Sequence, residues 1–319
     1  MQNSNHISKI IKSQAKALGF LECSIVPAGF LSEEKERFQS WLDAGMHGEM
    51  GYMARNIEKR LDPQLLLENA KTILIVLQNY HTHETQKDPE APVLSKYAYG
   101  TDYHFIMKDK LKKLLQFIQE EITPCNGRPF VDSAPVLERA WARRAGLGWV
   151  GKNSNLISVE HGSFFFIGEI ILDTELPYDE PRVVADHCGT CTRCIDACPT
   201  NAIVNNRVID ARKCISYQTI ELRGDLDENL KGQFENRVFG CDICQDICPW
   251  NLKAEPHNEP DLKPAPELLE LTRKDWYEIN KPVFNRLFKK SAVKRTGFKG
   301  LKRNLEFIQS EKPMKNEKA

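Results

Sequence analysis

Apolar residues return every three or four positions in three segments of the chain, 7–18, 32–44 and 102–122. This period matches the turn of an α-helix and places apolar side chains on one face, so each segment is predicted to be an amphipathic helix. Ser32, which two glutamates follow, is typical of a helix start. Residues 72–80 are instead apolar almost without interruption, and so short an apolar run predicts a buried strand.

The segment 128–153 carries signals for a strand, a sharp turn and then a helix. Pro135 suits the first turn of that helix, and Gly146 suits its end. The next segment, 155–172, predicts a hairpin that turns at Gly162. Strands and helices therefore mix in this half of the chain.

Two polar, proline-containing segments, 174–182 and 253–267, divide the chain. We therefore expect three domains, with the bounds 1–180, 181–255 and 256–319. The predicted fold class is α+β, with an α/β-like N-terminal domain. A ferredoxin-like cysteine module and a short helical tail are expected to follow it.

Composition narrows the class of protein. The chain has 319 residues and a formal net charge of zero, and 41% of its residues are hydrophobic, so it can bury a substantial core. The N-terminus has no apolar signal core, and no run of about 18 apolar residues occurs, which predicts a cytoplasmic protein without a membrane span.

Eight of the ten cysteines lie between residues 188 and 248, and they form two groups. The first group follows the pattern C-x2-C-x2-C-x3-C-P, which is the spacing of bacterial ferredoxins. The second group is a stretched counterpart that ends in C-x2-C-x3-C-P. Zinc also binds C-x2-C pairs, and a disulfide framework is a further alternative, but neither requires the C-x3-C-P step. Cys23 and Cys125 are interpreted as ordinary thiols.

In ferredoxins the fourth cysteine of each run binds the other cluster, so the spacing predicts two mixed sets of ligands. The first set, for one [4Fe-4S] cluster, is Cys188, Cys191, Cys194 and Cys248. The second set, for the other cluster, is Cys198, Cys214, Cys241 and Cys244. Two such clusters conduct single electrons, but a mere carrier would not need the other two domains.

No dinucleotide or phosphate-binding motif reveals where the electrons go. Four segments together resemble the epoxyqueuosine reductase family: 131–153, 187–203, 214–251 and 294–304. The resemblance covers most of the chain. It implies an oxidoreductase that reduces the epoxide of epoxyqueuosine to queuosine at the tRNA wobble position, the last step of queuosine biosynthesis, with cobalamin and two [4Fe-4S] clusters.

By the same resemblance Asp132 is the catalytic proton donor and also contacts the cofactor. Its place after an apolar strand suits an aimed carboxylate, although an aspartate here could equally cap the helix expected near Pro135. The D-x-H-x-x-G signature of histidine-ligated corrinoid domains is absent from the sequence. We therefore expect a cobalt without a protein histidine on its lower face, close to the first cysteine set.

The family resemblance implies a wider group of cofactor contacts, because a corrin carries amides and a phosphodiester that bind polar donors. These residues are Arg60, Ser95, Asp132, Arg139, Lys152, Asn153, Ser154 and Ser216. The alternative for the basic residues is a solvated helix face, which is our interpretation of Arg143 and Arg144.

The C-terminal segment 289–303 holds seven basic residues and no acidic one, in a chain that is neutral overall. This asymmetry predicts either a solvated basic helix or a phosphate-binding surface. With the resemblance, we expect contacts to the anticodon stem-loop of tRNA, whose modified nucleotide would be splayed into the active site. The expected contact residues are Lys294, Arg295, Lys299, Lys302 and Arg303.

Two rival functions stay open at this point. A reductive dehalogenase-like enzyme would also combine a corrin with two clusters, but many such enzymes are exported and no twin-arginine signal occurs here. A non-enzymatic electron-transfer or RNA-binding iron–sulfur protein would bind no corrin. The preferred interpretation adds an external low-potential electron donor as partner and a monomeric state.

Overall fold

A computed structural model describes residues 2–309 of the chain. Its central feature is a four-stranded sheet in the order β1-β2-β7-β4, in which every neighbouring pair is antiparallel. The strands are β1 Glu22–Pro27, β2 Thr72–Asn79, β7 Phe165–Leu172 and β4 Gly127–Phe130. The domain is thus of the α+β type, and the parallel pairing of an α/β domain is not found in this sheet.

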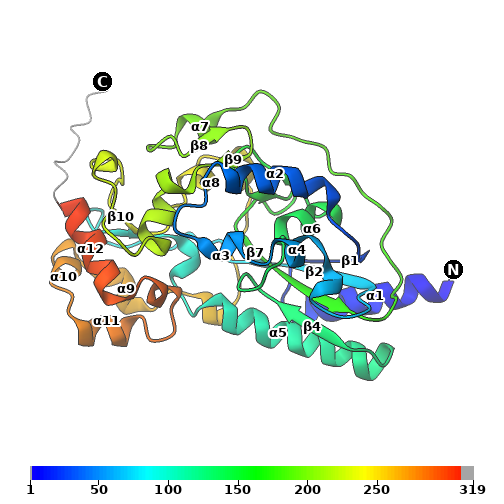
Figure 1. Ribbon diagram of the computed structural model, residues 1–319. Helices are drawn as coiled ribbons and strands as arrows, with labels where there is room; N and C mark the ends of the chain where they lie inside the picture. The colour runs from blue at the N-terminus through cyan, green and yellow to red at the C-terminus, as the bar shows by residue number, and fades with distance from the viewer. Residues whose placement is uncertain (1, 310–319) are drawn as a thin grey trace.

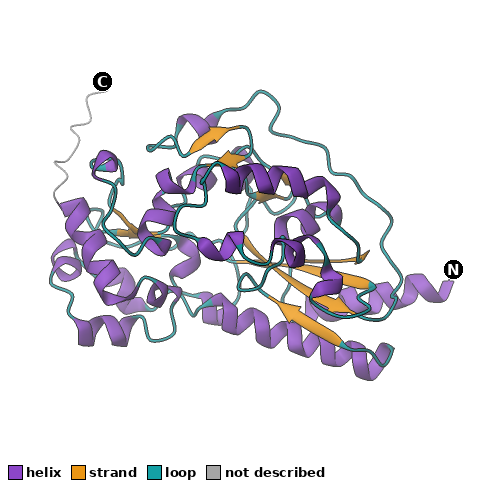
Figure 2. Ribbon diagram, in the orientation of Figure 1, coloured by secondary structure: helices purple, strands orange, loops and turns teal. Residues whose placement is uncertain are grey.

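Helices cover both faces of the sheet, as Figures 1 and 2 show. On one face α1 (Gln2–Ala17) and α5 (Tyr103–Phe117) pack on Leu74 and Val76 of β2. On the other face α4 (Ile57–Leu61) and α6 (Glu138–Arg144) pack on the alternate side chains of the same strand. Because both faces are covered, β2 is apolar at every position from 73 to 77, and all five side chains are fully buried.

The predicted helices over 7–18, 32–44 and 102–122 are confirmed, and so is the strand over 72–80. The second helix is α2, Ser32–Asp43, and α5 continues through Ile118–Ile122 as a π-helical turn. A four-residue helix, α3 (Gly51–Ala54), follows α2.

The hairpin predicted over 155–172 is wrong, although the chain does turn tightly at Gly162, which has a φ of 66°. The strand before the turn, β6 (Leu156–Ile157), pairs with β5 (Trp149–Val150). The strand after it, β7, lies between β2 and β4. Its side chains are almost all apolar, and only a central position in the sheet buries both of its faces.

The prediction for Pro135 is also wrong, because α6 begins three residues later, at Glu138. The chain leaves β4 through Asp132 in a left-handed conformation, with a φ of 50°. Residues 131–137 therefore form a loop instead of a first helical turn. Gly146, with a φ of 71°, ends α6 as predicted.

The two cysteine runs share one local form. A short helix, α7 (Arg193–Asp196) or α8 (Ile243–Asp246), precedes the last cysteine of each run. A small antiparallel pair, β8 (Ile203–Asn205) with β9 (Val208–Ile209), follows the first run. Figure 2 shows the long loop that leads from β7 over the top of the molecule to α7.

The C-terminal helices gather at the end of the molecule opposite the N-terminus (Figure 1). Residues 91–99 join their hydrophobic core, and β3 (Val93–Leu94) pairs in parallel with β10 (Arg237–Phe239). The helices are α9 Pro266–Glu270, α10 Arg273–Tyr277, α11 Lys281–Leu287 and α12 Gly297–Gln309. Within residues 2–309, no helix combines the length and the apolar character that a membrane crossing needs.

Candidate active site

A cavity of about 1520 Å³ lies between the main sheet, α2, the start of α5 and the cysteine module. This volume exceeds the range of about 300–1,000 Å³ that is usual for small-ligand sites, so it suits an unusually large ligand. Seven of the eight predicted cofactor contacts line it: Arg60, Ser95, Asp132, Arg139, Asn153, Ser154 and Ser216. Lys152 lies outside, and its amine donates a 2.7 Å hydrogen bond to the carbonyl oxygen of Gly189.

Asp132 stands at the wall of this cavity with 59% of its side chain exposed. The hydroxyl of Tyr103 donates a hydrogen bond to Oδ2 of Asp132, and Nε2 of His104 lies 3.7 Å from the same oxygen. The helix-cap alternative for Asp132 is wrong, because Leu137 holds the N-cap position of α6. The carboxylate is instead directed at the first turn of α5.

Asp102 organises this first turn. It is the N-cap of α5, and its carboxylate accepts a hydrogen bond from the backbone N–H of His104 at 3.0 Å. The same oxygen lies 2.7 Å from Nδ1 of His104, which orients the ring so that Nε2 faces Asp132. The ring of Tyr103 stacks on Phe166 of β7 at 4.1 Å.

Tyr103 and His104 were not predicted from the sequence as site residues. The available signal was an N-cap aspartate directly before two polar aromatic residues, at the start of a strongly amphipathic helix. That signal places both side chains at a helix end, but it does not reveal which loop they face.

Two further acids lie behind Asp132. The backbone N–H of Asp132 donates to the carboxylate of Glu138, and burial together with the charge of Asp132 raises the pKa of Glu138 to about 8. Glu169 of β7 is fully buried, and neither of its carboxylate oxygens has a hydrogen-bond partner among the described residues. Burial, and then the charge of Glu138, raise the pKa of Glu169 well above its ordinary value. The raised pKa values therefore favour the protonated form of both groups.

The fold brings the predicted cysteine sets together. Burial and then the nearby Cys188 and Cys191 raise the pKa of Cys248, so the last cysteine of the second run lies beside the first run. Burial and then Cys241 and Cys214 raise the pKa of Cys244 in the same way. Every cysteine is a free thiol, which contradicts the disulfide alternative.

The spacing of the thiols also distinguishes a cluster from a single ion. Four sulfurs around one zinc ion lie about 3.8 Å apart, given Zn–S bonds of about 2.3 Å. Among the described residues, the only group of three possible ligands within 4.8 Å of one another is Glu22, Glu160 and His161, on the surface. No three sulfurs of either cysteine set therefore lie within 4.8 Å of one another, which does not match the geometry of a single zinc ion.

The cavity borders the second cysteine set, because all four of its members line the wall. The first set lines a separate hollow of about 40 Å³ together with His187 and Trp250. The expectation that the cofactor lies close to the first set is therefore wrong for this cavity. The first set is the more remote of the two, and Nε1 of Trp149 donates a 3.4 Å hydrogen bond to Sγ of Cys188.

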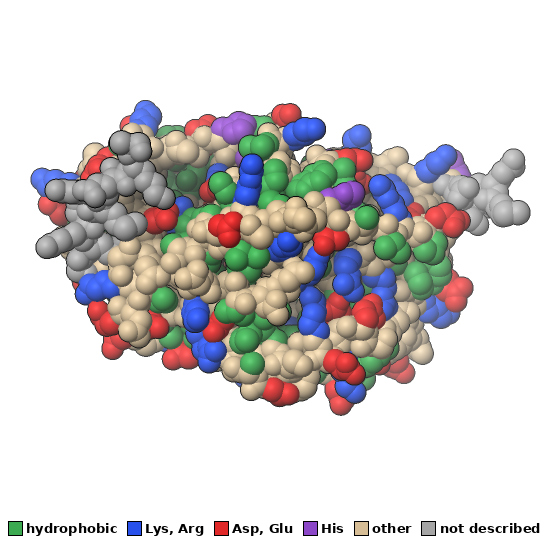
Figure 3. All heavy atoms as spheres, turned by 90° about the horizontal axis from the view of Figure 1, so that it is seen from above, with side chains coloured by type: hydrophobic (Ala, Val, Ile, Leu, Met, Phe, Trp, Pro, Cys, Tyr) green, Lys and Arg blue, Asp and Glu red, His purple; other side chains and the backbone are tan. Residues whose placement is uncertain are grey.

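The basic residues predicted to contact RNA fall into two groups. Arg295 forms a two-bond ion pair with Glu221, at 2.6 and 2.7 Å. Arg303 and Lys302 donate to backbone carbonyl oxygens, among them those of Leu222 (from Arg303) and Tyr277 (from Lys302). Only Lys294 and Lys299, of the five predicted residues, are exposed without a side-chain partner in the described part of the chain. Figure 3 shows basic and acidic side chains interspersed over the upper face of the molecule.

The donors of the cavity fit a cofactor that carries amides and a phosphodiester. Arg60 is 93% buried, and its Nε has no hydrogen-bond partner in the described structure. A buried unpaired donor in a cavity wall suits an acceptor on a bound ligand. His104 is the only histidine that lines the cavity within the described residues, and Asp102 and Asp132 face its two nitrogens.

Comparisons with known proteins agree with this geometry. A family model described as "4Fe-4S double cluster binding domain" matches residues 187–251, and one described as "Epoxyqueuosine reductase QueG, DUF1730" matches residues 60–133. An epoxyqueuosine reductase from Cellulophaga algicola is 54% identical over 308 residues, which cover 97% of this chain and 100% of that protein.

Two solved structures extend the likeness to the fold. An epoxyqueuosine reductase with an epoxyqueuosine-modified tRNA-Tyr stem loop has a TM-score of 0.88 and 29% identity, over 96% of this chain and 81% of that chain. A Bacillus subtilis epoxyqueuosine reductase, whose catalytic aspartate loop is swung out of the active site, has a TM-score of 0.86 and 28% identity. It matches over 96% of this chain and 81% of that chain.

Proposed function

The chain belongs to the epoxyqueuosine reductase family, and from this membership we propose how its cavity performs the family's reaction. The chain is an oxidoreductase that reduces epoxyqueuosine to queuosine, with tRNA as its substrate. Membership of this family favours that function over a reductive dehalogenase and over a non-enzymatic electron carrier. The observation that carries the proposal is the position of Asp132, which lines the same cavity as the four thiols of the second cysteine set.

The reaction removes the epoxide oxygen as water. It breaks two C–O bonds, forms a C=C bond, and consumes two electrons and two protons. Asp132 is the group that we assign to protonate the oxygen as the ring opens, since its carboxyl group reaches the cavity from a backbone loop.

The neighbours of Asp132 prepare it for this role. The hydroxyl of Tyr103 and the carboxylate of Glu138 bind its side chain and its backbone N–H, so the loop 131–137 is held against α5 and α6. Glu138 accepts the N–H of Asp132, and its raised pKa favours the protonated acid, so we propose that it restores the proton of Asp132 after each turnover. In a Bacillus relative this loop swings out of the active site, and we propose the same motion here for the entry of RNA.

Iron–sulfur clusters belong to the cysteine module, and we propose their ligands as the two sets given above. An external low-potential donor would reduce the first set, which lies remote from the cavity. Electrons would then pass to the second set at the cavity wall.

Cobalamin is the proposed ligand of the large cavity. Its cobalt would supply the two electrons at the substrate. Arg60, Arg139, Asn153 and Ser154 offer donors to its amides and phosphodiester, and Ser95 and Ser216 complete the predicted contacts. No side chain but His104 could offer imidazole from the described wall, and Asp102 already holds that ring.

The three predicted domains divide this work. Residues 1–180 would hold cobalamin and Asp132, 181–255 the two clusters, and 256–319 would contact tRNA. We further predict a monomer, located in the cytoplasm, where its tRNA substrate is found.

One experiment tests the function. The protein is purified anaerobically, reconstituted with iron, sulfide and cobalamin, and given a chemical reductant and a tRNA stem-loop that carries epoxyqueuosine. Mass spectrometry of the digested RNA should show conversion of epoxyqueuosine to queuosine by the loss of one oxygen. About eight irons without bound cobalamin, and without this product, would favour the electron-carrier alternative instead.

A further inference from the structure

An exposed aromatic side chain and three exposed lysines lie together at the start of α5, next to the cavity. We propose that Phe105, Lys108, Lys289 and Lys290, here called the α5 patch, bind the anticodon loop of tRNA beside Asp132. The proposal rests on the function proposed above and names the surface on which that substrate docks.

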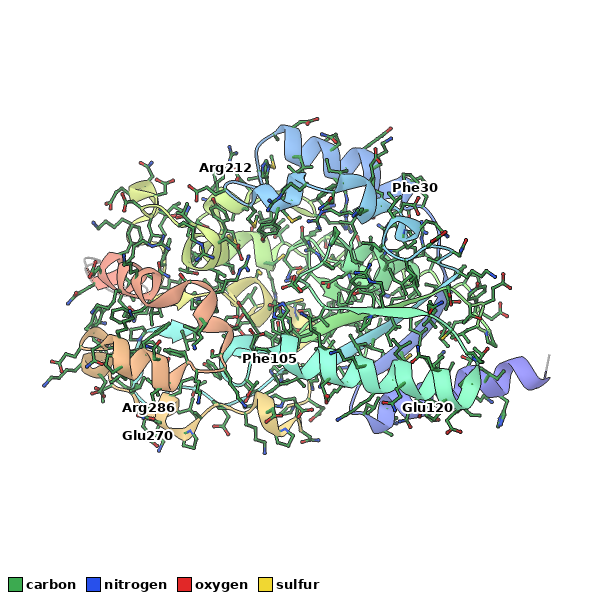
Figure 4. The ribbon with its side chains drawn as sticks, turned by 60° about the horizontal axis from the view of Figure 1, so that its bottom comes forward. Phe30, Phe105, Glu120, Arg212, Glu270 and Arg286 are labelled. Atoms are coloured by element: carbon green, nitrogen blue, oxygen red, sulfur yellow. The ribbon has the colours of Figure 1, made fainter. Side chains whose placement is uncertain are left out.

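Phe105 is an exposed aromatic residue next to the proposed active site. Its side chain is 63% exposed, although it stands on the helix that buries Ile106 and Met107 in the core. It directly follows His104, whose Nε2 lies 3.7 Å from Oδ2 of Asp132. Figure 4 labels Phe105 at the N-terminal end of α5, where the helix meets the C-terminal part of the molecule. A single exposed aromatic side chain is common on protein surfaces and does not by itself indicate a binding site. The lysines near Phe105 are therefore the deciding observation.

The three lysines of the α5 patch lie on segments next to Phe105. Lys108 lies one helical turn further on, and its Nζ is 3.5 Å from Oγ of Ser133, the residue after Asp132. The carbonyl oxygen of Lys290 accepts a 2.6 Å hydrogen bond from the backbone N–H of Asp102, which brings Lys289 and Lys290 to the start of α5. All three lysines are exposed, and none forms a salt bridge with an acid in residues 2–309.

The nearby acids are occupied elsewhere. Asp102 faces Nδ1 of His104, and Asp109 pairs with Lys113 at 2.8 Å. Lys110, which points to the opposite side of α5, pairs with Glu259. Asp261 is a further exposed acid nearby, and its carbonyl oxygen accepts a 2.7 Å hydrogen bond from the N–H of Thr101. With three lysines, the α5 patch still carries an excess of positive charge at the edge of the site.

Four lysines of the segment 289–303 are exposed without a salt bridge in residues 2–309: Lys289, Lys290, Lys294 and Lys299. The other charges of this segment are less available. Arg295 and Arg303 bind Glu221 and the backbone carbonyl oxygens of 218 and 222, and Lys302 binds that of Tyr277. An RNA that reaches Asp132 thus finds unpaired cations on the α5 side of the cavity.

The α5 patch matches what a single-stranded loop offers. When one nucleotide is splayed into a pocket, its neighbours leave the stack and expose their bases and phosphates. An exposed aromatic ring stacks on such a base without regard to its sequence, and lysines bind the phosphates. Phe105 would take the base next to epoxyqueuosine, and Lys108, Lys289 and Lys290 would take the flanking phosphates.

The test measures the dissociation constant of the reconstituted protein for an anticodon stem-loop that carries epoxyqueuosine. Phe105→Ala should weaken binding about 5- to 150-fold, as the loss of one base stack does, and Phe105→Trp should bind at least as well as the natural protein. The matched control is Phe30→Ala. Phe30 is 47% exposed and lies at the far side of the molecule in Figure 4, so this change should leave binding unaltered.

Salt dependence tests the lysines separately. The double variant Lys289→Gln and Lys290→Gln should reduce the slope of log K against log salt by about 1.4, or about 0.7 for each lost phosphate contact. Lys9→Gln with Lys16→Gln, on the exposed side of α1, removes the same charge at the opposite end of the molecule and should leave the slope unchanged.

The outcomes separate the α5 patch from the function. If the natural protein reduces the stem-loop while the Phe105 and lysine variants bind it with unaltered affinity and slope, the α5 patch is wrong and the reductase function stands. If the natural protein neither binds nor reduces the stem-loop, the reductase function fails, and the α5 patch fails with it.

Discussion

Tyr103 and Asp132 meet across two elements of the fold, with the tyrosine hydroxyl donating its hydrogen bond to the carboxylate of the aspartate. Burial and the charge of Asp132 raise the pKa of Tyr103 far above its ordinary value, so the hydroxyl keeps its proton and remains a donor. Stacking on Phe166 fixes the orientation of the tyrosine ring. The proposed proton donor, on a loop, is thus positioned by a residue at the start of a helix.

Tyr103→Phe should therefore lower kcat/KM by about 2- to 10-fold, because a hydrogen bond to the neutral carboxyl group that donates the proton contributes about 0.5–1.5 kcal/mol. The phenylalanine ring keeps the stacking on Phe166, so Tm should change little. Steady-state kinetics on the stem-loop, with Tm measured on the same samples, checks both statements. A large fall in Tm would show that the hydroxyl serves folding and not the position of Asp132.

Asp132→Asn should lower kcat by about 10²- to 10⁴-fold, the usual contribution of a positioned general acid. The amide can still accept the hydrogen bond from Tyr103 but cannot deliver a proton. Iron content and cobalamin binding should stay at the level of the natural protein. Asp109→Asn is the control, because Asp109 is an exposed acid on α5 whose ion-pair partner is Lys113 and not a residue of the loop 131–137. Full turnover by Asp132→Asn would remove it from catalysis.

Glu138 gives the stability of the protein a distinct pH dependence. Its pKa rises from an ordinary 4.5 to about 8 on folding, so the folded chain holds a proton that the unfolded chain has released between these values. The free energy of unfolding should fall as the pH rises through this range.

Glu138→Gln, which preserves the acceptor for the Asp132 N–H, should make this fall smaller, and the part that Glu169 contributes should remain. The variant should have the higher Tm above pH 8, and its advantage should disappear below pH 4.5. Glu120→Gln, at an exposed site that Figure 4 labels on the π-helical turn after α5, should leave the pH profile of Tm unchanged. Parallel Tm profiles for the natural protein and Glu138→Gln would contradict the assignment.

The mixed pairing of the cysteines can be tested one cluster at a time. Cys248→Ser should reduce the iron content from about eight to about four atoms and remove the cluster of the first set. The affected cluster should be the one beside Trp149, although residue 248 lies in the second run. Cys125→Ser should keep the full iron content. Loss of the other cluster on Cys248→Ser, identified by its EPR spectrum, would reverse the pairing.

The double-cluster domain was predictable from the sequence, because the spacing of ligands along a short stretch limits what they can bind. The long helices and strand β2 were predictable because their apolar periods are unbroken. The position of β7 was not, since an apolar strand does not reveal which neighbours it pairs with. The sequence around Pro135 suggested a helix start, but the left-handed turn at Asp132 delays α6 to Glu138.

The catalytic neighbourhood was only half predictable for the same reason. Asp132 was found through resemblance, whereas Tyr103 and His104 depend on how α5 crosses the loop after β4. Ion pairs between residues that are far apart in the sequence could not be predicted either. Arg295 and Glu221 lie 74 residues apart in the chain, and their ion pair changes which cations are free for RNA.

Trp149 is expected to affect the reduction potential of the first cluster. Its side chain is 97% buried between His187 and Trp250, and its indole N–H donates to the sulfur of Cys188 at 3.4 Å. Donors to a ligand sulfur stabilise the reduced, more negative cluster and raise its reduction potential. Trp149→Phe should thus lower the potential of that cluster by roughly 20–60 mV, the equivalent of one hydrogen bond in a one-electron couple.

An anaerobic redox titration followed by EPR measures this shift, and the cluster of the second set provides an internal reference. Trp250→Phe is the matched control, because it replaces a neighbouring indole in the same aromatic group by a smaller ring and keeps the hydrogen bond from Trp149 to Cys188. Equal shifts in both variants would show that burial, and not the indole N–H, sets the potential. A shift confined to Trp149→Phe would show that the indole N–H raises the reduction potential of the first cluster. This higher potential favours electron transfer from the external donor to the first cluster. It lowers the driving force for transfer from the first cluster to the second.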